Sequence, residues 1–215
     1  MNAKLFLVLF FFLPSLLFAQ SPDSLKVLYT PDSLINKPAP YFSGKSIKGT
    51  VFSSENFKGK VTLLNFWFIS CMPCMHEIPY LNKIHKDYSG KDFQIISVAN
   101  NARKDLMSFN DTTKPDGLTY LRRSLKTETI NYEIIPACEK RKKRKAIKDT
   151  TVIGQECDYI TSDYFIHLYP TTFIIDKRGI VRYLHPGFAM SDEYALKQTE
   201  EYRQVISKLL SDSEF

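Results

Sequence analysis

The chain has 215 residues, of which 44% are hydrophobic and 24% are charged, as expected for one globular domain with a substantial core. Its formal charge of +6 is a mild basic excess, concentrated in residues 140–145. This run lacks the interleaved aromatic residues of a nucleic-acid-binding surface. We expect it to be a solvated loop rather than a docking site for an acidic partner. We therefore expect no nucleic-acid partner.

The first residues have the pattern of a secretory signal peptide. Lys4 precedes an apolar stretch over residues 5–18, and Ala19 offers a small residue for cleavage before Gln20. The stretch is shorter than the roughly 20 apolar residues that span a bilayer, and no cysteine follows it for a lipid anchor. We predict that residues 1–19 are removed rather than kept as an anchor. The mature protein is then periplasmic or otherwise extracytoplasmic, without stable membrane insertion.

A polar segment separates this signal from the predicted domain. Residues 20–35 are rich in turn-forming residues and are expected to act as a linker, so that the domain covers residues 36–215. Its first element is a small β-hairpin over residues 41–52, with turns near Gly44 and Gly49.

The clearest pattern follows the hairpin. Residues 61–68 are apolar except for Thr62 and Asn65, which predicts a strand buried on both faces. Residues 72–88 then carry apolar side chains at spacings of three and four, which predicts an amphipathic helix.

Strands and helices continue to alternate, which predicts parallel pairing. Residues 122 to about 160 break the order and are predicted to be an insertion. The other expected elements are a strand over 93–99, a helix over 101–109, a short strand over 118–121, an antiparallel hairpin over 171–184 and a last helix from about residue 191. The predicted fold class is α/β, a central mixed β-sheet flanked by helices.

Two cysteines at the start of the predicted helix point to redox chemistry. Cys71 and Cys74 are separated by two residues on the first helical turn, which holds both sulfurs close enough to bond. The helix N-terminus favours a thiolate at Cys71, the expected nucleophile, while Cys74 is expected to resolve the mixed disulfide. A structural disulfide and half of a zinc site are the alternatives. No second cysteine pair at this spacing completes four zinc ligands, so we expect no metal and no cofactor.

The motifs in order resemble the TlpA/ResA-type branch of exported thioredoxin-like proteins. The resemblance rests on Asn-Phe-Trp at 65–67, Cys-Met-Pro-Cys at 71–74, Glu77 with Pro79, and Pro-Thr-Thr-Phe-Ile-Ile-Asp at 170–176 followed by Gly179. It implies a thioredoxin-like fold, with the insertion before the strand that follows a cis-proline. It also implies a thiol-disulfide oxidoreductase that reduces disulfide-containing exported proteins, in some members during cytochrome c maturation, with electrons from an upstream membrane donor.

The resemblance also implies a role for Glu77 as a proton shuttle. Thioredoxins have a buried Asp on the central strand, where this chain has Asn65. The corresponding carboxyl group is therefore expected on the helix, at Glu77. A surface glutamate that complements the helix dipole is the alternative.

Further site residues follow from the same resemblance. Tyr169 and Pro170 match the cis-proline peptide that offers backbone groups to a client, and Trp67 matches the aromatic residue beside the cysteines, although core packing explains Trp67 as well. Ser70 departs from the pattern, because the family usually has a second tryptophan before the first cysteine.

Two further cysteines flank the predicted insertion. Cys138 and Cys157 fit a structural disulfide that pins a long loop, and a redox relay with Cys71 and Cys74 is the alternative.

Two other classes of function remain open. In thioredoxin-like copper carriers two cysteines act with a distant histidine, here His167 or His185, although the cysteines of those proteins are usually three residues apart. A binding module with an inert disulfide is the other possibility.

Overall fold

The computed structural model describes residues 30–113, 117–125, 127–138 and 159–212. The predicted signal peptide, the basic run at 140–145 and Cys157 lie outside these residues, so the predictions about them stay predictions. In the described part, no helix is both long enough and apolar enough to span a bilayer.

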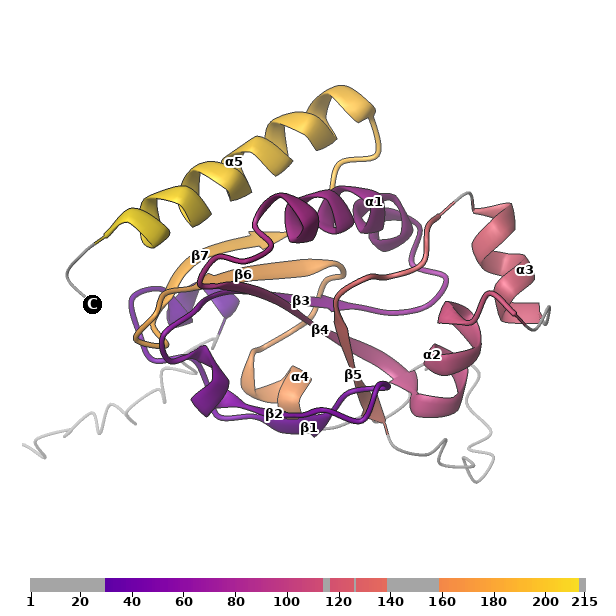
Figure 1. Cartoon of the computed structure of the whole chain (residues 1–215), viewed down its shortest axis with the longest axis horizontal. Helices are drawn as coiled ribbons and strands as arrows, with labels where there is room; N and C mark the ends of the chain where they lie inside the picture. The colour runs from indigo at the N-terminus through magenta and orange to yellow at the C-terminus, as the bar shows by residue number, and fades with distance from the viewer. Residues whose placement is uncertain (1–29, 114–116, 126, 139–158, 213–215) are drawn as a thin grey trace, which may run out of the picture.

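A mixed five-stranded sheet forms the centre of the molecule (Figure 1). Its strand order is β5-β4-β3-β6-β7, with β3 parallel to β4, β4 parallel to β5, and the remaining neighbours antiparallel. The strands are β3 (Val61–Trp67), β4 (Phe93–Ala102), β5 (Glu133–Cys138), β6 (Thr171–Ile175) and β7 (Val181–Pro186). The predicted mixed sheet and its parallel pairing are confirmed.

Alternate side chains of β3 enter two separate cores, because successive residues of a strand point to opposite faces. Leu63 and Trp67 belong to the cluster that also contains apolar side chains of α1 (Met72–Asp87) and α5 (Asp192–Ser211). Figure 1 shows α1 and α5 together over one face of the sheet. Every residue of β3 is buried, as its apolar run predicts.

The opposite face of the sheet is covered by shorter elements. Leu64 and Phe66 share a second cluster with residues of η1 (Pro31–Leu34), η2 (Ser54–Phe57) and α4 (Tyr159–Asp163). Helices therefore lie on both faces, as predicted.

The N-terminal hairpin is present as a separate two-stranded sheet, β1 (Ser43–Lys45) with β2 (Val51–Ser53). Gly44 brings it against the edge of the main sheet: a Cβ at this position would lie 2.5 Å from Cγ2 of Ile135. Any larger residue at position 44 would force the Ile135 side chain to move.

Residues 118–121 are helical rather than a strand. They lie in α3 (Gly117–Ser124), which follows α2 (Arg103–Asn110). Leu118, Leu121 and Leu125 pack against the same cluster as α1, and their spacing of three and four is helical. A window of four residues is too short to show this period.

Two segments predicted to be an insertion and a linker contribute to the fold. Residues 133–138, within the predicted insertion, form β5 at the edge of the main sheet. Leu34, within the predicted linker, is buried in the second cluster, and the Asn36 N–H donates to the Val181 carbonyl at 2.8 Å. Neither segment has a long apolar pattern, because an edge strand and a single helical turn each bury few side chains.

Candidate active site

The two redox cysteines lie where β3 turns into α1. Ser70 makes the turn with φ of 70°, a left-handed conformation that few residues other than glycine adopt. Cys71 caps α1, and its sulfur accepts a hydrogen bond from the Cys74 N–H at 3.3 Å. The pair forms a disulfide with Cα atoms 5.2 Å apart. The bonded pair predicted at a helix N-terminus is therefore confirmed, and the structure is that of the oxidised protein.

Glu77 lies about one turn beyond Cys74, and its side chain is buried, with 1% exposed. Its carboxylate accepts three hydrogen bonds, from Asn65 Nδ2 at 2.9 Å, the Thr172 hydroxyl at 3.2 Å and the Tyr202 hydroxyl at 3.4 Å. Burial raises the pKa of Glu77 from 4.5 to about 8, and the three hydrogen bonds oppose the rise. The interpretation as a surface glutamate is wrong. A carboxyl group with this pKa can exchange a proton near neutral pH.

Sheet register explains why these distant residues meet. Asn65 of β3 is directly opposite Thr172 of β6, and the Asn65 amide also donates to the Thr172 hydroxyl at 3.0 Å. Both side chains point to the face covered by α1, where they reach Glu77. Tyr202 comes from α5, which lies beside α1 on that face.

Tyr202 is the site residue that sequence reasoning missed. Tyr202 lies among the regularly spaced apolar residues of α5, and its side chain is fully buried. A hydroxyl in such a stripe requires a buried partner, which is the signal that could have identified it.

The Tyr169–Pro170 peptide bond is cis, as the family pattern implied. The Tyr169 ring packs edge to face on Phe68 at 5.2 Å, and Tyr169 contacts the cluster that contains both redox cysteines. The Pro170 carbonyl accepts a hydrogen bond from the Gly187 N–H at 2.6 Å. The connection between β7 and α5 is thus attached to the cis-proline peptide.

Trp67 is 2% exposed and packs against Phe109 of α2 with ring centroids 5.8 Å apart. It shares the cluster of Cys71 and Cys74. The position beside the cysteines agrees with the family pattern, and the burial favours core packing over direct contact with a client.

The histidines proposed for a copper site are not gathered around the cysteines as a ligand group. His167 is exposed, and Nδ1 of His185 is within hydrogen-bonding distance of Gln198 Nε2 at 2.8 Å. Among the described residues, no group of three His, Cys, Asp or Glu side chains is arranged to hold a metal ion.

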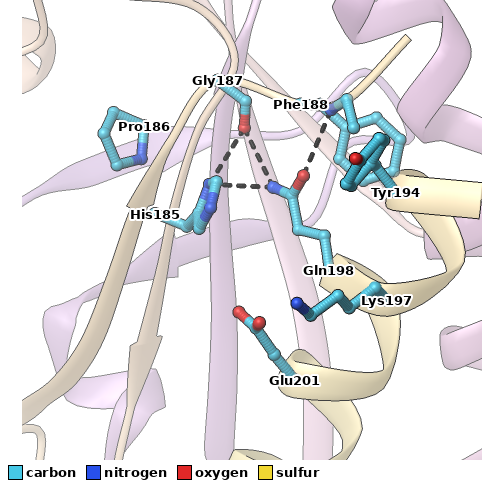
Figure 2. A pocket seen from close by; sticks show the side chains of 9 residues that line it. His185, Pro186, Gly187, Phe188, Tyr194, Lys197, Gln198 and Glu201 are labelled. Carbon is cyan, nitrogen blue, oxygen red and sulfur yellow. Dashed lines mark hydrogen bonds between the residues drawn. The ribbon is translucent and has the colours of Figure 1, made fainter. Parts of the chain in front are cut away.

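A surface pocket of about 510 Å³ opens beside this region (Figure 2). It is lined by residues 185–189 and by four side chains of α5, namely Tyr194, Lys197, Gln198 and Glu201. Gln198 is 6% exposed, and its amide nitrogen donates to the Tyr202 hydroxyl at 2.8 Å. Gln198 therefore joins the pocket to the hydrogen-bond network of Glu77.

The second cysteine pair is only partly described. The backbone of Cys138 ends β5, and Cys157 lies outside the described residues. Their pairing stays a prediction.

Comparison with known proteins places this site in a family. The model of the AhpC/TSA family matches residues 35–184. A thiol-disulfide oxidoreductase ResA from Bacillus thuringiensis subsp. konkukian (strain 97-27) is 39% identical over 173 residues, 80% of this chain and 79% of that protein. The thioredoxin-like protein YneN from Bacillus subtilis (strain 168) is 29% identical over 163 residues, 74% of this chain and 75% of that protein.

A solved structure supports the fold. The crystal structure of a putative thiol:disulfide interchange protein DsbE from Chlorobium tepidum aligns with a TM-score of 0.53 and 23% identity, over 78% of this chain and 96% of that one. Together with the bonded Cys71–Cys74 pair at the start of α1, the family match and the ResA relative show that the chain belongs to the AhpC/TSA family of thioredoxin-like proteins and is a thiol-disulfide oxidoreductase of the ResA type.

Proposed function

We propose that this protein reduces disulfide bonds of exported proteins through a dithiol–disulfide cycle of Cys71 and Cys74. The observation that carries the proposal is a redox pair at a helix N-terminus with a buried, titratable carboxyl group about one turn away. A disulfide that served only to stabilise the fold would not require such a group.

The cycle begins with the reduced protein. The Cys71 thiolate attacks one sulfur of a client disulfide, which forms a mixed disulfide and releases the other client sulfur as a thiolate that takes up a proton. Cys74 then loses its proton and attacks the Cys71 sulfur, and the second client thiol leaves. Two electrons have passed to the client, and the Cys71–Cys74 disulfide seen in the structure is the product.

The proposed acceptor of the Cys74 proton is Glu77. Cys74 is 1% exposed, so water has little access to it, whereas Glu77 lies on the same helix and is equally buried. Burial raises the pKa of Glu77 from 4.5 to about 8, which makes its carboxylate a far better proton acceptor for a thiol than an ordinary glutamate is.

The proposed client edge is the Tyr169–Pro170 peptide. Tyr169 is partly exposed and packs on Phe68, which precedes the cysteine turn. Met72, between the cysteines, is 50% exposed and adds an apolar contact surface. Trp67 supports this surface from beneath, through the core that it shares with the cysteines.

The predicted signal peptide supports an extracytoplasmic location. In that compartment a dithiol stays reduced only when a donor supplies electrons, so the proposal includes an upstream membrane dithiol donor. Apocytochrome c thiols that await haem are the client class suggested by the family resemblance.

Insulin disulfide reduction tests the proposed activity. With dithiothreitol as donor, the wild-type protein should accelerate insulin precipitation and Cys71→Ser should not. A Cys71→Ser variant with the wild-type rate would remove the enzymatic interpretation. Thiol trapping in the native compartment tests the direction: reduced Cys71 and Cys74 are expected, and a fully oxidised pair would contradict reductase function.

A further inference from the structure

A hydrogen-bonded chain leads from the buried acid to the surface pocket of Figure 2. Glu77 is 1% exposed, Tyr202 is 0% exposed and Gln198 is 6% exposed. The Tyr202 hydroxyl donates to Glu77 Oε1 at 3.4 Å and accepts from Gln198 Nε2 at 2.8 Å. Figure 2 shows the outer end of this chain, where Gln198 reaches across to His185 and Gly187.

The Gln198 hydrogen bond fixes the direction in which Tyr202 donates. A phenol hydroxyl has a single proton, and here a donor approaches its oxygen from Gln198, so the proton is free to point to Glu77. The Gln198 amide is itself held, because its oxygen accepts from the Ala189 N–H at 3.2 Å and its nitrogen donates to the Gly187 carbonyl at 3.0 Å.

The Gln198 amide has two protons and three neighbouring acceptors: His185 Nδ1, the Gly187 carbonyl and the Tyr202 hydroxyl. When Nδ1 carries a proton it donates to the Gly187 carbonyl at 3.2 Å, and the two amide protons of Gln198 serve that carbonyl and Tyr202. When Nδ1 is unprotonated it accepts from Gln198, and Gln198 then donates to Tyr202 only in place of the Gly187 carbonyl.

The geometry points to Tyr202, oriented by Gln198, as a positioning residue that stabilises the ionised form of Glu77. The inference rests on the proposed function, in which Glu77 accepts the proton of Cys74. It assigns to α5 a part in the redox site, since the acid on α1 relies on a donor from α5 as well as on the sheet residues Asn65 and Thr172.

Within the described part of the protein, Tyr202 is the titratable side chain that hydrogen-bonds to Glu77. Tyr132, in the segment before β5, is close enough for an electrostatic interaction with Glu77, and Tyr183 and His185 of β7 flank Tyr202 at 5.8 Å and 6.3 Å between ring centroids. Burial raises the pKa values of Tyr132 and Tyr202 well above that of an ordinary tyrosine, so both keep their protons near neutral pH.

The test measures the titration of Glu77 in the oxidised protein by ¹³C NMR of carboxyl-labelled glutamate, with the signal assigned by its loss in Glu77→Gln. In Tyr202→Phe we expect the titration midpoint of Glu77 to rise by about one pH unit, because a long hydrogen bond to the carboxylate is lost. In disulfide reduction, kcat/KM should increase with pH, and in the same variant this increase should occur at higher pH because less of Glu77 is ionised at a given pH.

Tyr183→Phe is the matched control. Its hydroxyl donates to Glu201 at 3.3 Å, and its ring packs against Tyr202. An unchanged Glu77 midpoint in Tyr202→Phe, or an equal shift in both variants, would overturn the inference. If Tyr202→Phe does not fold, Gln198→Met replaces it. A smaller rise of the Glu77 midpoint is then expected, and an unchanged midpoint would contradict the inference. Loss of insulin reduction in Cys71→Ser is measured separately, so failure of the proposed function and failure of the inference are distinguishable.

Discussion

Burial of an ionisable side chain is costly unless hydrogen bonds or neutralisation compensate, and Glu77 shows both. Three donors converge on its carboxylate, yet burial still raises its pKa from 4.5 to about 8. The family pattern singled out Glu77, but no pattern in the sequence predicts how far it is buried. That depends on the register of β3 with β6 and on the position of α5, which bring Asn65, Thr172 and Tyr202 to it.

The raised pKa of Glu77 predicts that the oxidised protein loses stability as pH rises. The unfolded carboxyl group ionises from about pH 4.5 upward, whereas the folded one stays protonated until about pH 8. The free energy of unfolding should therefore fall by about 3 kcal/mol between pH 5 and pH 8 from this group alone. Glu77→Gln should lack this component, as measured by chemical denaturation at the two pH values.

An exposed carboxylate on α5 provides the control, because Glu200→Gln should keep the wild-type dependence on pH. If the free energy of unfolding changed equally with pH in the wild type and in Glu77→Gln, Glu77 would have an ordinary pKa in the folded protein.

At the scale of single elements, α1 has a clear amphipathic pattern but contains a proline in its interior. The helix includes Pro79, which has no N–H to bond the carbonyl of Met75 four residues earlier. The Thr127 hydroxyl, from the segment before β5, donates to that carbonyl at 2.8 Å. A distant residue thus replaces the hydrogen bond that proline removes.

This replacement can be tested with a double-mutant cycle. Thr127→Val leaves the buried Met75 carbonyl without this donor and should lower the free energy of unfolding by about 1 to 2 kcal/mol. In a Pro79→Ala background the helix regains its own N–H donor, so the same substitution should cost less. Equal costs in both backgrounds, measured by urea denaturation, would contradict the compensation.

The turn between β6 and β7 depends on one buried carboxylate. Asp176 is fully buried, and its Oδ1 accepts from the N–H groups of Arg178 and Ile180, both at 2.9 Å. Its Oδ2 accepts from Arg182 Nε at 2.7 Å. The predicted hairpin over residues 171–184 requires a turn here, but the carboxylate that holds the turn was not predicted.

Asp176→Asn should destabilise the protein by about 2 to 3 kcal/mol, because the new amide can direct a donor at the Arg182 guanidinium. Arg178→Gln is the control. Its guanidinium is half-exposed and 3.8 Å from Asp176, so a change below about 1 kcal/mol is expected. Thermal or urea denaturation measures both variants, and similar losses would contradict the assigned role of Arg182.

At the scale of the whole molecule, the sequence predicted the elements with strong periodicity and missed those with weak periodicity. The buried run of β3, the amphipathic α1 and the β6–β7 hairpin were predicted because each buries many side chains in a regular pattern. The edge strand β5 and the short helix α3 were missed because their placement depends on contacts with the rest of the fold. The redox pair was predicted from local spacing alone, whereas the network around Glu77 required the tertiary structure.

The proposed dithiol–disulfide cycle requires Cys71 as the nucleophile and Cys74 as the residue that completes it. Trapping of the mixed disulfide distinguishes these two roles. Reduced Cys74→Ser is mixed with a disulfide-bonded peptide, quenched with an alkylating agent and mapped by mass spectrometry, so that adducts at Cys138 or Cys157 are distinguished. We predict a stable mixed disulfide between the peptide and Cys71, and none in Cys71→Ser. Absence of the Cys71 adduct, or an equal adduct at Cys74 in Cys71→Ser, would show that Cys71 is not the nucleophile.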